Sequence, residues 1–190
     1  VPYYNKPTQD GLFEHFKTIA EATSLPCIPY NVPSRTITNL NADTVIRLSQ
    51  IPNIIGVKEA SSNLEQIARI CGIGPRFLVY SGNDGDTLPM LSLGAYGVIS
   101  VASHLVGRQI RDMIDRFVKG ETEKAAQIHR DLLPLVSALF VVSNPIPVKY
   151  ALDYLGFRVG QGRLPLTPPD AKTRATIEAV LKSYRIDLRI

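Results

Sequence analysis

The chain has 190 residues, 45% of them apolar and 20% charged, with a formal net charge of +4. The apolar residues suffice to bury a sizeable core, which excludes an intrinsically disordered protein, and no apolar run approaches the roughly 18 residues that span a bilayer. Because the basic excess is scattered, an ordinary soluble surface is favoured, and neither nucleic acid nor a membrane is expected as a partner.

Cysteine and histidine residues are few and scattered. Cys27 and Cys71 lie among apolar residues, which is typical of free thiols in a reducing compartment. No basic and apolar leader opens the chain, so a cytoplasmic location is expected. The three histidines lack partners at ligand spacing, and no metal site is predicted at His15, His104 or His129.

The first 120 residues alternate between short apolar runs and amphipathic segments. Apolar residues at helical spacing predict a helix from about Gln9 to Ala22. Apolar runs between turn formers predict strands at Cys27–Tyr30, Ile54–Lys58, Phe77–Tyr80 and Gly97–Val101. The helical period returns after each strand, in segments that start near Asn41, Leu64, Leu88 and Val106. Strands that are apolar on both faces and alternate with helices indicate a parallel sheet covered by helices.

After Gly120 only helical patterns remain. Helices are predicted at Glu121–Phe140, Pro147–Leu155 and Pro169–Tyr184. The change of rhythm predicts a C-terminal helical region over residues 121–190.

The strands of residues 1–120 fit either a small open α/β sheet or the second half of a (β/α)8 TIM barrel. Polar residues fall at the carboxyl ends of the predicted strands, namely Tyr30-Asn31, Lys58-Glu59, Ser81-Gly82-Asn83 and Ser100. In a closed barrel these ends surround one mouth, whereas an open sheet spreads them along a crevice. Their convergence favours the half-barrel.

Lys58 is the most informative single position. It ends the apolar run Ile54–Val57, so its amine is expected to emerge from an apolar wall. Removal from water lowers the pKa of an ammonium group and leaves a nucleophilic amine that can form a Schiff base. The alternative is a lysine that simply reaches solvent past the strand end, which is the commoner fate of a lone lysine.

Two more residues are predicted at the same mouth. Tyr30 ends the preceding strand, and its phenol could relay protons to a substrate carbonyl, or serve as a core tyrosine with a bonded hydroxyl. Arg35 follows in a loop, where a guanidinium could hold a carboxylate or remain a solvated charge. The turn Ser81–Gly85 could cradle a phosphate but is more often only a turn. Asn144, before a predicted helix, could also face the site.

Several segments resemble the dihydrodipicolinate synthase family. They are Val-Pro-Tyr-Tyr-Asn-Lys-Pro at 1–7, Tyr-Asn-Val-Pro-Ser-Arg-Thr at 30–36, Gly-Val-Lys-Glu-Ala at 56–60, Ser-Gly-Asn-Asp at 81–84, Gly-Val-Ile-Ser-Val at 97–101 and Asn-Pro-Ile-Pro-Val-Lys at 144–149. The resemblance covers essentially the whole chain. It implies a pyruvate-dependent, Schiff-base-forming synthase of bacterial lysine biosynthesis that needs no cofactor beyond the covalent imine.

The resemblance also implies roles for single residues. Lys58 would form the imine with pyruvate and Tyr30 would relay protons, while Tyr4 would reach the site of a neighbouring subunit. Arg35 would hold the carboxylate of aspartate semialdehyde. The remaining implied positions are Gly82 and Ile99 in the pyruvate pocket and Tyr3 in a lysine-feedback site.

The family's chains begin with four further βα units, and TIM barrels usually need about 250 residues. Val1 is therefore expected at the end of the fourth strand, with the family's Thr-Thr motif lying outside this sequence. Alternatives are an inactive half-barrel fragment that dimerises through exposed apolar surface, and another aldolase of the superfamily such as N-acetylneuraminate lyase, which lacks an arginine at the place of Arg35. A homo-oligomer is expected, as the family's dimer of dimers or only a dimer.

Overall fold

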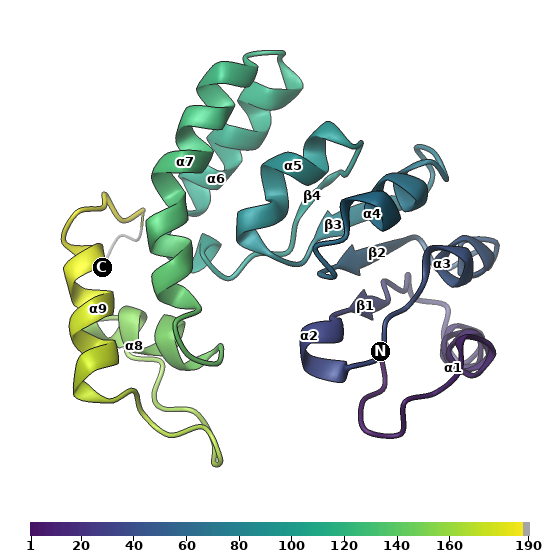
Figure 1. Cartoon of the computed structure of the whole chain (residues 1–190), viewed down its shortest axis with the longest axis horizontal. Helices are drawn as coiled ribbons and strands as arrows, with labels where there is room; N and C mark the ends of the chain where they lie inside the picture. Colours follow the sequence, from purple (N-terminus) through teal and green to yellow (C-terminus); the bar gives the residue numbers. More distant parts are fainter. Residues whose placement is uncertain (188–190) are drawn as a thin grey trace. The chain divides into compact units, whose positions relative to one another are not determined.

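The computed structural model describes residues 1–187. The chain divides into two compact units, Val1–Ile99 and Ser100–Ile190 (Figure 1). The division lies before the long helix α6 (Ser103–Val118), whereas the rhythm of the sequence predicted a change after Gly120.

The first unit is built on a parallel sheet. Among the described residues the strand order is β1 (Tyr30–Asn31), β2 (Gly56–Glu59), β3 (Leu78–Ser81) and β4 (Gly97–Val98). The strand order follows the chain order, as expected of consecutive βα units. In this register Tyr30 pairs with Lys58, and Lys58 in turn pairs with Tyr80.

The first and last strands are shorter than predicted. Cys27 makes only an isolated bridge to Ile54, and the regular pairing starts at Tyr30. Pro29 lies between them and has no N–H to contribute to a ladder. At the other end, β4 stops at Val98, although the Ile99 nitrogen still donates to the Ser81 carbonyl at 3.0 Å.

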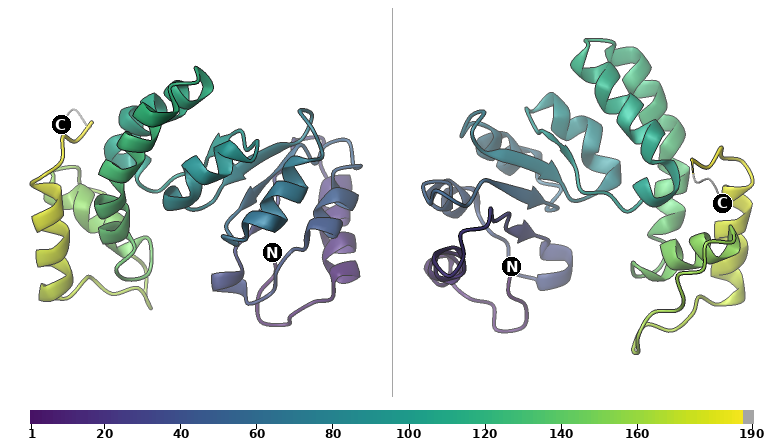
Figure 2. Two further views of the ribbon diagram at one scale, coloured as in Figure 1. Left: turned by 45° about the horizontal axis from the view of Figure 1, so that its top comes forward. Right: turned by 180° about the vertical axis from the view of Figure 1, so that it is seen from behind.

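Helices separate the strands and line one side of the sheet (Figure 2). They are α1 (Gln9–Glu21), α3 (Ala42–Leu48), α4 (Leu64–Cys71) and α5 (Thr87–Ser92), the last preceded by the 3-10 turn η1 (Asp84–Asp86). The short helix α2 (Pro33–Thr36) follows β1 directly and is not part of this layer (Figure 1). Thr8 and Asn63 cap α1 and α4 by accepting from the Gly11 and Gln66 nitrogens.

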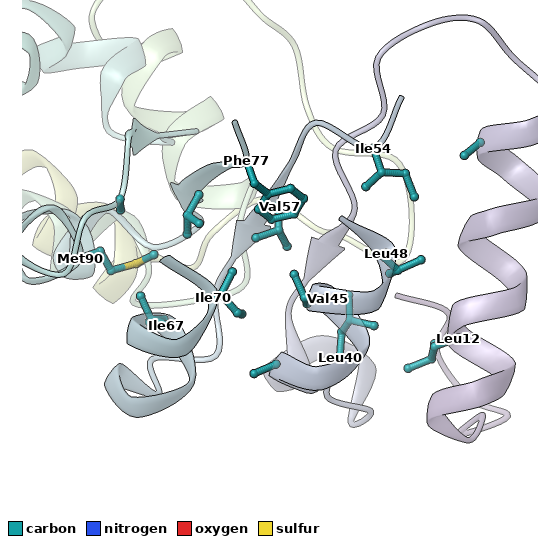
Figure 3. Close-up of a cluster of buried hydrophobic side chains, with 14 residues drawn as sticks. Leu12, Leu40, Val45, Leu48, Ile54, Val57, Ile67, Ile70, Phe77 and Met90 are labelled. Atoms are coloured by element: carbon teal, nitrogen blue, oxygen red, sulfur yellow. The ribbon is translucent and has the colours of Figure 1, made fainter. Parts of the chain in front are cut away.

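The core of the first unit lies between these helices and the sheet (Figure 3). Val57 and Val79 of the strands belong to one buried cluster with Leu12, Val45 and other side chains of the helical layer. Burying one such side chain stabilises a fold by roughly 1.5–3 kcal/mol. This packing fixes which face of each strand is turned inward and leaves the other face for Tyr30, Lys58 and Tyr80, which are half-buried.

In its described residues, up to position 187, the regular structure of the second unit is helical. Helix α6 packs on α7 (Thr122–Leu139), and α9 (Ala171–Leu181) packs on both α7 and α8 (Ile146–Tyr154). Leu105, Leu135 and Ile177 are buried in this unit. Within residues 1–187 we find no helix of sufficient length and apolar character to span a membrane.

Gly56 offers a test of the β2–β3 register. A Cβ atom at this position would lie 2.2 Å from the Leu78 carbonyl oxygen, a backbone atom that cannot move without breaking the sheet. We expect Gly56→Ala to lower the free energy of unfolding by about 1–3 kcal/mol in urea denaturation. Gly11→Ala is the control, since its Cβ would meet nothing closer than 3.4 Å and helix propensity favours alanine. Equal stability of the two variants would contradict this register.

Candidate active site

Lys58 and Tyr30 lie together at the carboxyl ends of β2 and β1. They are register partners in the parallel pair, so both side chains leave the same face of the sheet. The Lys58 Nζ lies 4.3 Å from the centroid of the Tyr30 ring. The predicted proximity of these two side chains is therefore present in the structure.

Burial perturbs both groups. Loss of water around the amine lowers the pKa of Lys58 from its ordinary value of 10.5. The same effect raises the pKa of the Tyr30 phenol above 10.0. Because the folded-state pKa of Lys58 lies below its unfolded-state value, this group's contribution to stability increases as the pH rises through the folded-state pKa and levels off above 10.5.

Two charged residues shift the pKa of the Lys58 amine in opposite directions. The Asp84 carboxylate, which is buried in η1, raises the pKa of Lys58, and the Arg35 guanidinium lowers it, while burial remains the largest cause. Arg35 is exposed on the short helix α2 and also lowers the pKa of Tyr30. Arg35 is thus close enough to influence both members of the pair, as its predicted place above the mouth requires. The electrostatic role of Asp84 was not foreseen.

Gly82 and Ile99 lie at the same edge of the sheet. The Gly82 nitrogen donates to the Glu59 carbonyl at 2.7 Å, and Ile99 follows β4 beside Ser81. A Cβ at Gly82 would lie 2.7 Å from the Cβ of Ala60 and 3.2 Å from Cε2 of Tyr30. Absence of a side chain at Gly82 therefore leaves room for the Tyr30 ring.

Tyr3, Tyr4 and Asn144 are the remaining predicted residues. The side chains of Tyr3 and Tyr4 are 74% and 84% exposed, and Tyr4 has a positive φ of 69°. Asn144 belongs to the second unit, directly before α8, where it forms a cis peptide bond with Pro145. The functional roles of these three residues stay predictions.

Asn31 and Glu59 point away from the predicted mouth. Successive residues of a strand face opposite sides, so the neighbours of Tyr30 and Lys58 turn toward the helices. Both are 0% exposed, and the Asn31 Nδ2 donates to Glu59 Oε1 and Oε2, each at 3.0 Å. The expectation that all strand-end polar residues converge on one mouth is therefore wrong for this pair. The two-residue period of the strands could have predicted the difference.

A separate cavity of about 320 Å³ lies in the second unit, between α8, α9 and the segment that joins them. Its lining includes Lys149, Tyr150, Asp153 and Arg174. This lining contains none of the residues that the sequence predicts for chemistry. In residues 1–187 no three His, Cys, Asp or Glu side chains gather as a metal site would require.

Comparison with known proteins decides the family. The sequence model of the Dihydrodipicolinate synthetase family matches residues 1–184. The chain belongs to this family. It is 69% identical over 191 residues to the 4-hydroxy-tetrahydrodipicolinate synthase of Dehalococcoides mccartyi strain CBDB1, with 100% of this chain and 64% of the relative covered. The chain thus spans less than two thirds of the length of this curated relative.

Solved structures of the dihydrodipicolinate synthetase family match the fold closely. The lysine-bound enzyme of Cyanidioschyzon merolae superposes with a TM-score of 0.94 at 49% identity, covering 96% of this chain and 62% of that one. The enzyme of Acinetobacter baumannii gives 0.91 at 40% identity, covering 96% and 63%. The predicted fold class, part of a (β/α)8 barrel with a C-terminal helical region, is confirmed.

Because Asp84 and Arg35 shift the pKa of Lys58 in opposite directions, removing one charge or the other should have opposite effects on that pKa. Asp84→Asn removes an attraction for the ammonium and should lower the pKa of Lys58 further, whereas Arg35→Gln removes a repulsion and should raise it. Competitive acylation across a pH series, read at Lys58 by peptide mapping, measures both shifts. A shift of the Lys58 pKa in the same direction in both variants would contradict the arrangement.

Proposed function

We propose that the chain carries the imine-forming centre of a 4-hydroxy-tetrahydrodipicolinate synthase, which condenses pyruvate with aspartate 4-semialdehyde in lysine biosynthesis. The observation that carries the proposal is the partly buried Lys58 amine 4.3 Å from the Tyr30 ring centroid at the carboxyl ends of adjacent strands. Support comes from the family match and from the related Acinetobacter baumannii enzyme, which was solved in complex with pyruvate.

The first step follows from the chemistry of an amine beside a phenol. A neutral Lys58 Nζ attacks the keto carbon of pyruvate, forming a C–N bond, and the carbonyl oxygen leaves as water after proton transfers. The lowered pKa of Lys58 increases the fraction of amine able to attack at a given pH. Tyr30 remains protonated because burial raises the pKa of its hydroxyl, so it can donate a proton to the departing oxygen and take one back later.

The second substrate would bind at the open end of the strands. Arg35 is exposed there, and its planar guanidinium suits the carboxylate of aspartate semialdehyde. Gly82 and Ile99 would border the pyruvate. The 69% identity to a synthase, together with Arg35, favours this reaction over that of another aldolase of the superfamily.

The part of the relatives that this chain does not cover is expected to contribute to complete turnover. This chain spans about 64% of the curated relative from Dehalococcoides mccartyi, so we propose imine formation for the chain itself and complete turnover for the longer protein. Asn144 would face the site, and Tyr4 would reach the site of a neighbouring copy in a homo-oligomer. Tyr3 would belong to a lysine-responsive surface, in keeping with the lysine-bound relative from Cyanidioschyzon merolae. A cytoplasmic location fits such a biosynthetic role.

Pyruvate trapping tests the proposed chemistry. Incubation with pyruvate and borohydride should add to the intact chain the mass of pyruvic acid less one oxygen atom, located on Lys58 by peptide mapping. Lys58→Arg should abolish the adduct, and Tyr30→Phe should slow its formation about a hundredfold through loss of proton transfer. Lys149→Arg is the control, because this half-buried lysine bonds the Val159 carbonyl in the second unit. An adduct confined to another lysine would overturn the proposal.

Oligomerisation provides a separate test. The exposed rings of Tyr3 and Tyr4 suit burial against a second copy. Light scattering should show a mass above 20.9 kDa that falls with dilution, and replacement of both tyrosines by serine should weaken the association. Leu164→Ser, at another residue that is 84% exposed, should leave it unchanged. A clean monomer at every concentration would contradict the expected oligomer.

A further inference from the structure

We propose that Asn31 and Glu59 are positioning residues that hold Tyr30 and Lys58 at their working separation, an inference that rests on the function proposed for that pair. Each is the chain neighbour of one member of the reactive pair. Asn31 and Glu59 are themselves register partners, one step beyond Tyr30 and Lys58. Any slip between the two strands that separates the buried partners therefore also separates the reactive ones.

The regular strand structure is short at this point of the sheet. Strand β1 has only two residues, and the preceding Pro29 has no N–H to donate. Backbone hydrogen bonds beside the reactive pair include those from the Lys58 nitrogen to the Pro29 carbonyl and from the Ala60 nitrogen to the Asn31 carbonyl, both at 2.9 Å. A side-chain bridge between the strands adds a constraint to this two-residue stretch of regular pairing.

The bridge is saturated with hydrogen bonds. The Glu59 carboxylate accepts from Asn31, from the Ser61 nitrogen at 2.7 Å and from Gln66 Nε2 at 3.1 Å. The Asn31 Oδ1 accepts from the Leu40 nitrogen at 2.9 Å. Moving either side chain would break several buried hydrogen bonds at once, which is costly in a site removed from water.

The choice of residue types supports a geometric role. A leucine could fill this space between strand and helix, whereas a carboxylate must be withdrawn from water and fully bonded. Buried polar groups of this kind can specify one arrangement among several close alternatives. Gln66, on α4, reaches Glu59 but makes its other bonds to the Leu40 carbonyl and to Asn39. It therefore secures the network to the helix layer without linking the two strands.

This difference between Asn31 and Gln66 gives a matched pair of variants. Asn31→Ala removes the link between strands and changes no formal charge, while Gln66→Met removes hydrogen bonds to the same carboxylate from the helix side. Glu59→Gln is a second, isosteric way to weaken the bridge. The double variant Asn31→Asp with Glu59→Gln reverses the pair and restores an amide facing a carboxylate.

Three readouts on the 190-residue chain separate positioning from stability. Urea unfolding and circular dichroism report the fold, and the rate of pyruvate trapping reports the reaction. Acylation of Lys58 across a pH series reports the amine without any need for pyruvate. If the unaltered chain forms no pyruvate adduct, the proposed function fails, while the acylation profile still tests the positioning role.

The expected results distinguish the variants. Asn31→Ala should move the acylation profile of Lys58 to higher pH, because the loosened amine gains water, and should slow trapping about tenfold to a hundredfold. Glu59→Gln should slow trapping, and the reversed pair should restore it. Gln66→Met should lower stability but leave the Lys58 profile unchanged. Unchanged Lys58 behaviour in folded Asn31 and Glu59 variants, or an equal shift in Gln66→Met, would overturn the inference.

Discussion

The parallel register of β1 and β2 is the constraint on which the rest of the site depends. It pairs Tyr30 with Lys58 and Asn31 with Glu59, and the alternation of a strand sends the two pairs to opposite faces. One face is buried against the helices together with Val57, and the other presents a phenol and an amine. The buried pair and the pair proposed for chemistry are thus chain neighbours on opposite sides of one sheet.

The pKa of the Lys58 amine is set by several opposing effects, of which desolvation is the largest. Burial lowers the pKa of Lys58, Asp84 opposes the change and Arg35 reinforces it. The arrangement keeps the amine partly withdrawn from water while a carboxylate limits the shift. Burial raises the pKa of Tyr30, because the charged form of a phenol is its deprotonated form. The hydroxyl therefore keeps its proton beside an amine that has become easier to deprotonate. One shared environment therefore shifts the pKa values of the proposed nucleophile and the proposed proton donor together.

The sequence predicts the parts of this arrangement that depend on local patterns. Lys58 and Tyr30 end apolar runs, so their place at the carboxyl edge of a parallel sheet could be deduced from strand boundaries alone. The buried orientation of Asn31 and Glu59 depends on the strand period counted from Lys58, and convergence at one mouth was the wrong expectation for them. The effect of Asp84 depends on how the turn after β3 folds back, which no periodicity encodes.

Pro29 is visible in the sequence, but the extent to which it shortens β1 depends on pairing with β2. The roles proposed for Tyr4 and Asn144 follow from the family resemblance and not from a pattern in the strands.

A crystal structure of the chain after treatment with pyruvate and borohydride is the most direct test of the central claim. The account predicts continuous density from Lys58 Nζ to a reduced pyruvate carbon, with the Tyr30 hydroxyl within hydrogen-bond distance of the adduct and Asn31 still bonded to Glu59. Density on a different lysine, or an adduct on Lys58 with Tyr30 turned away from it, would contradict the account.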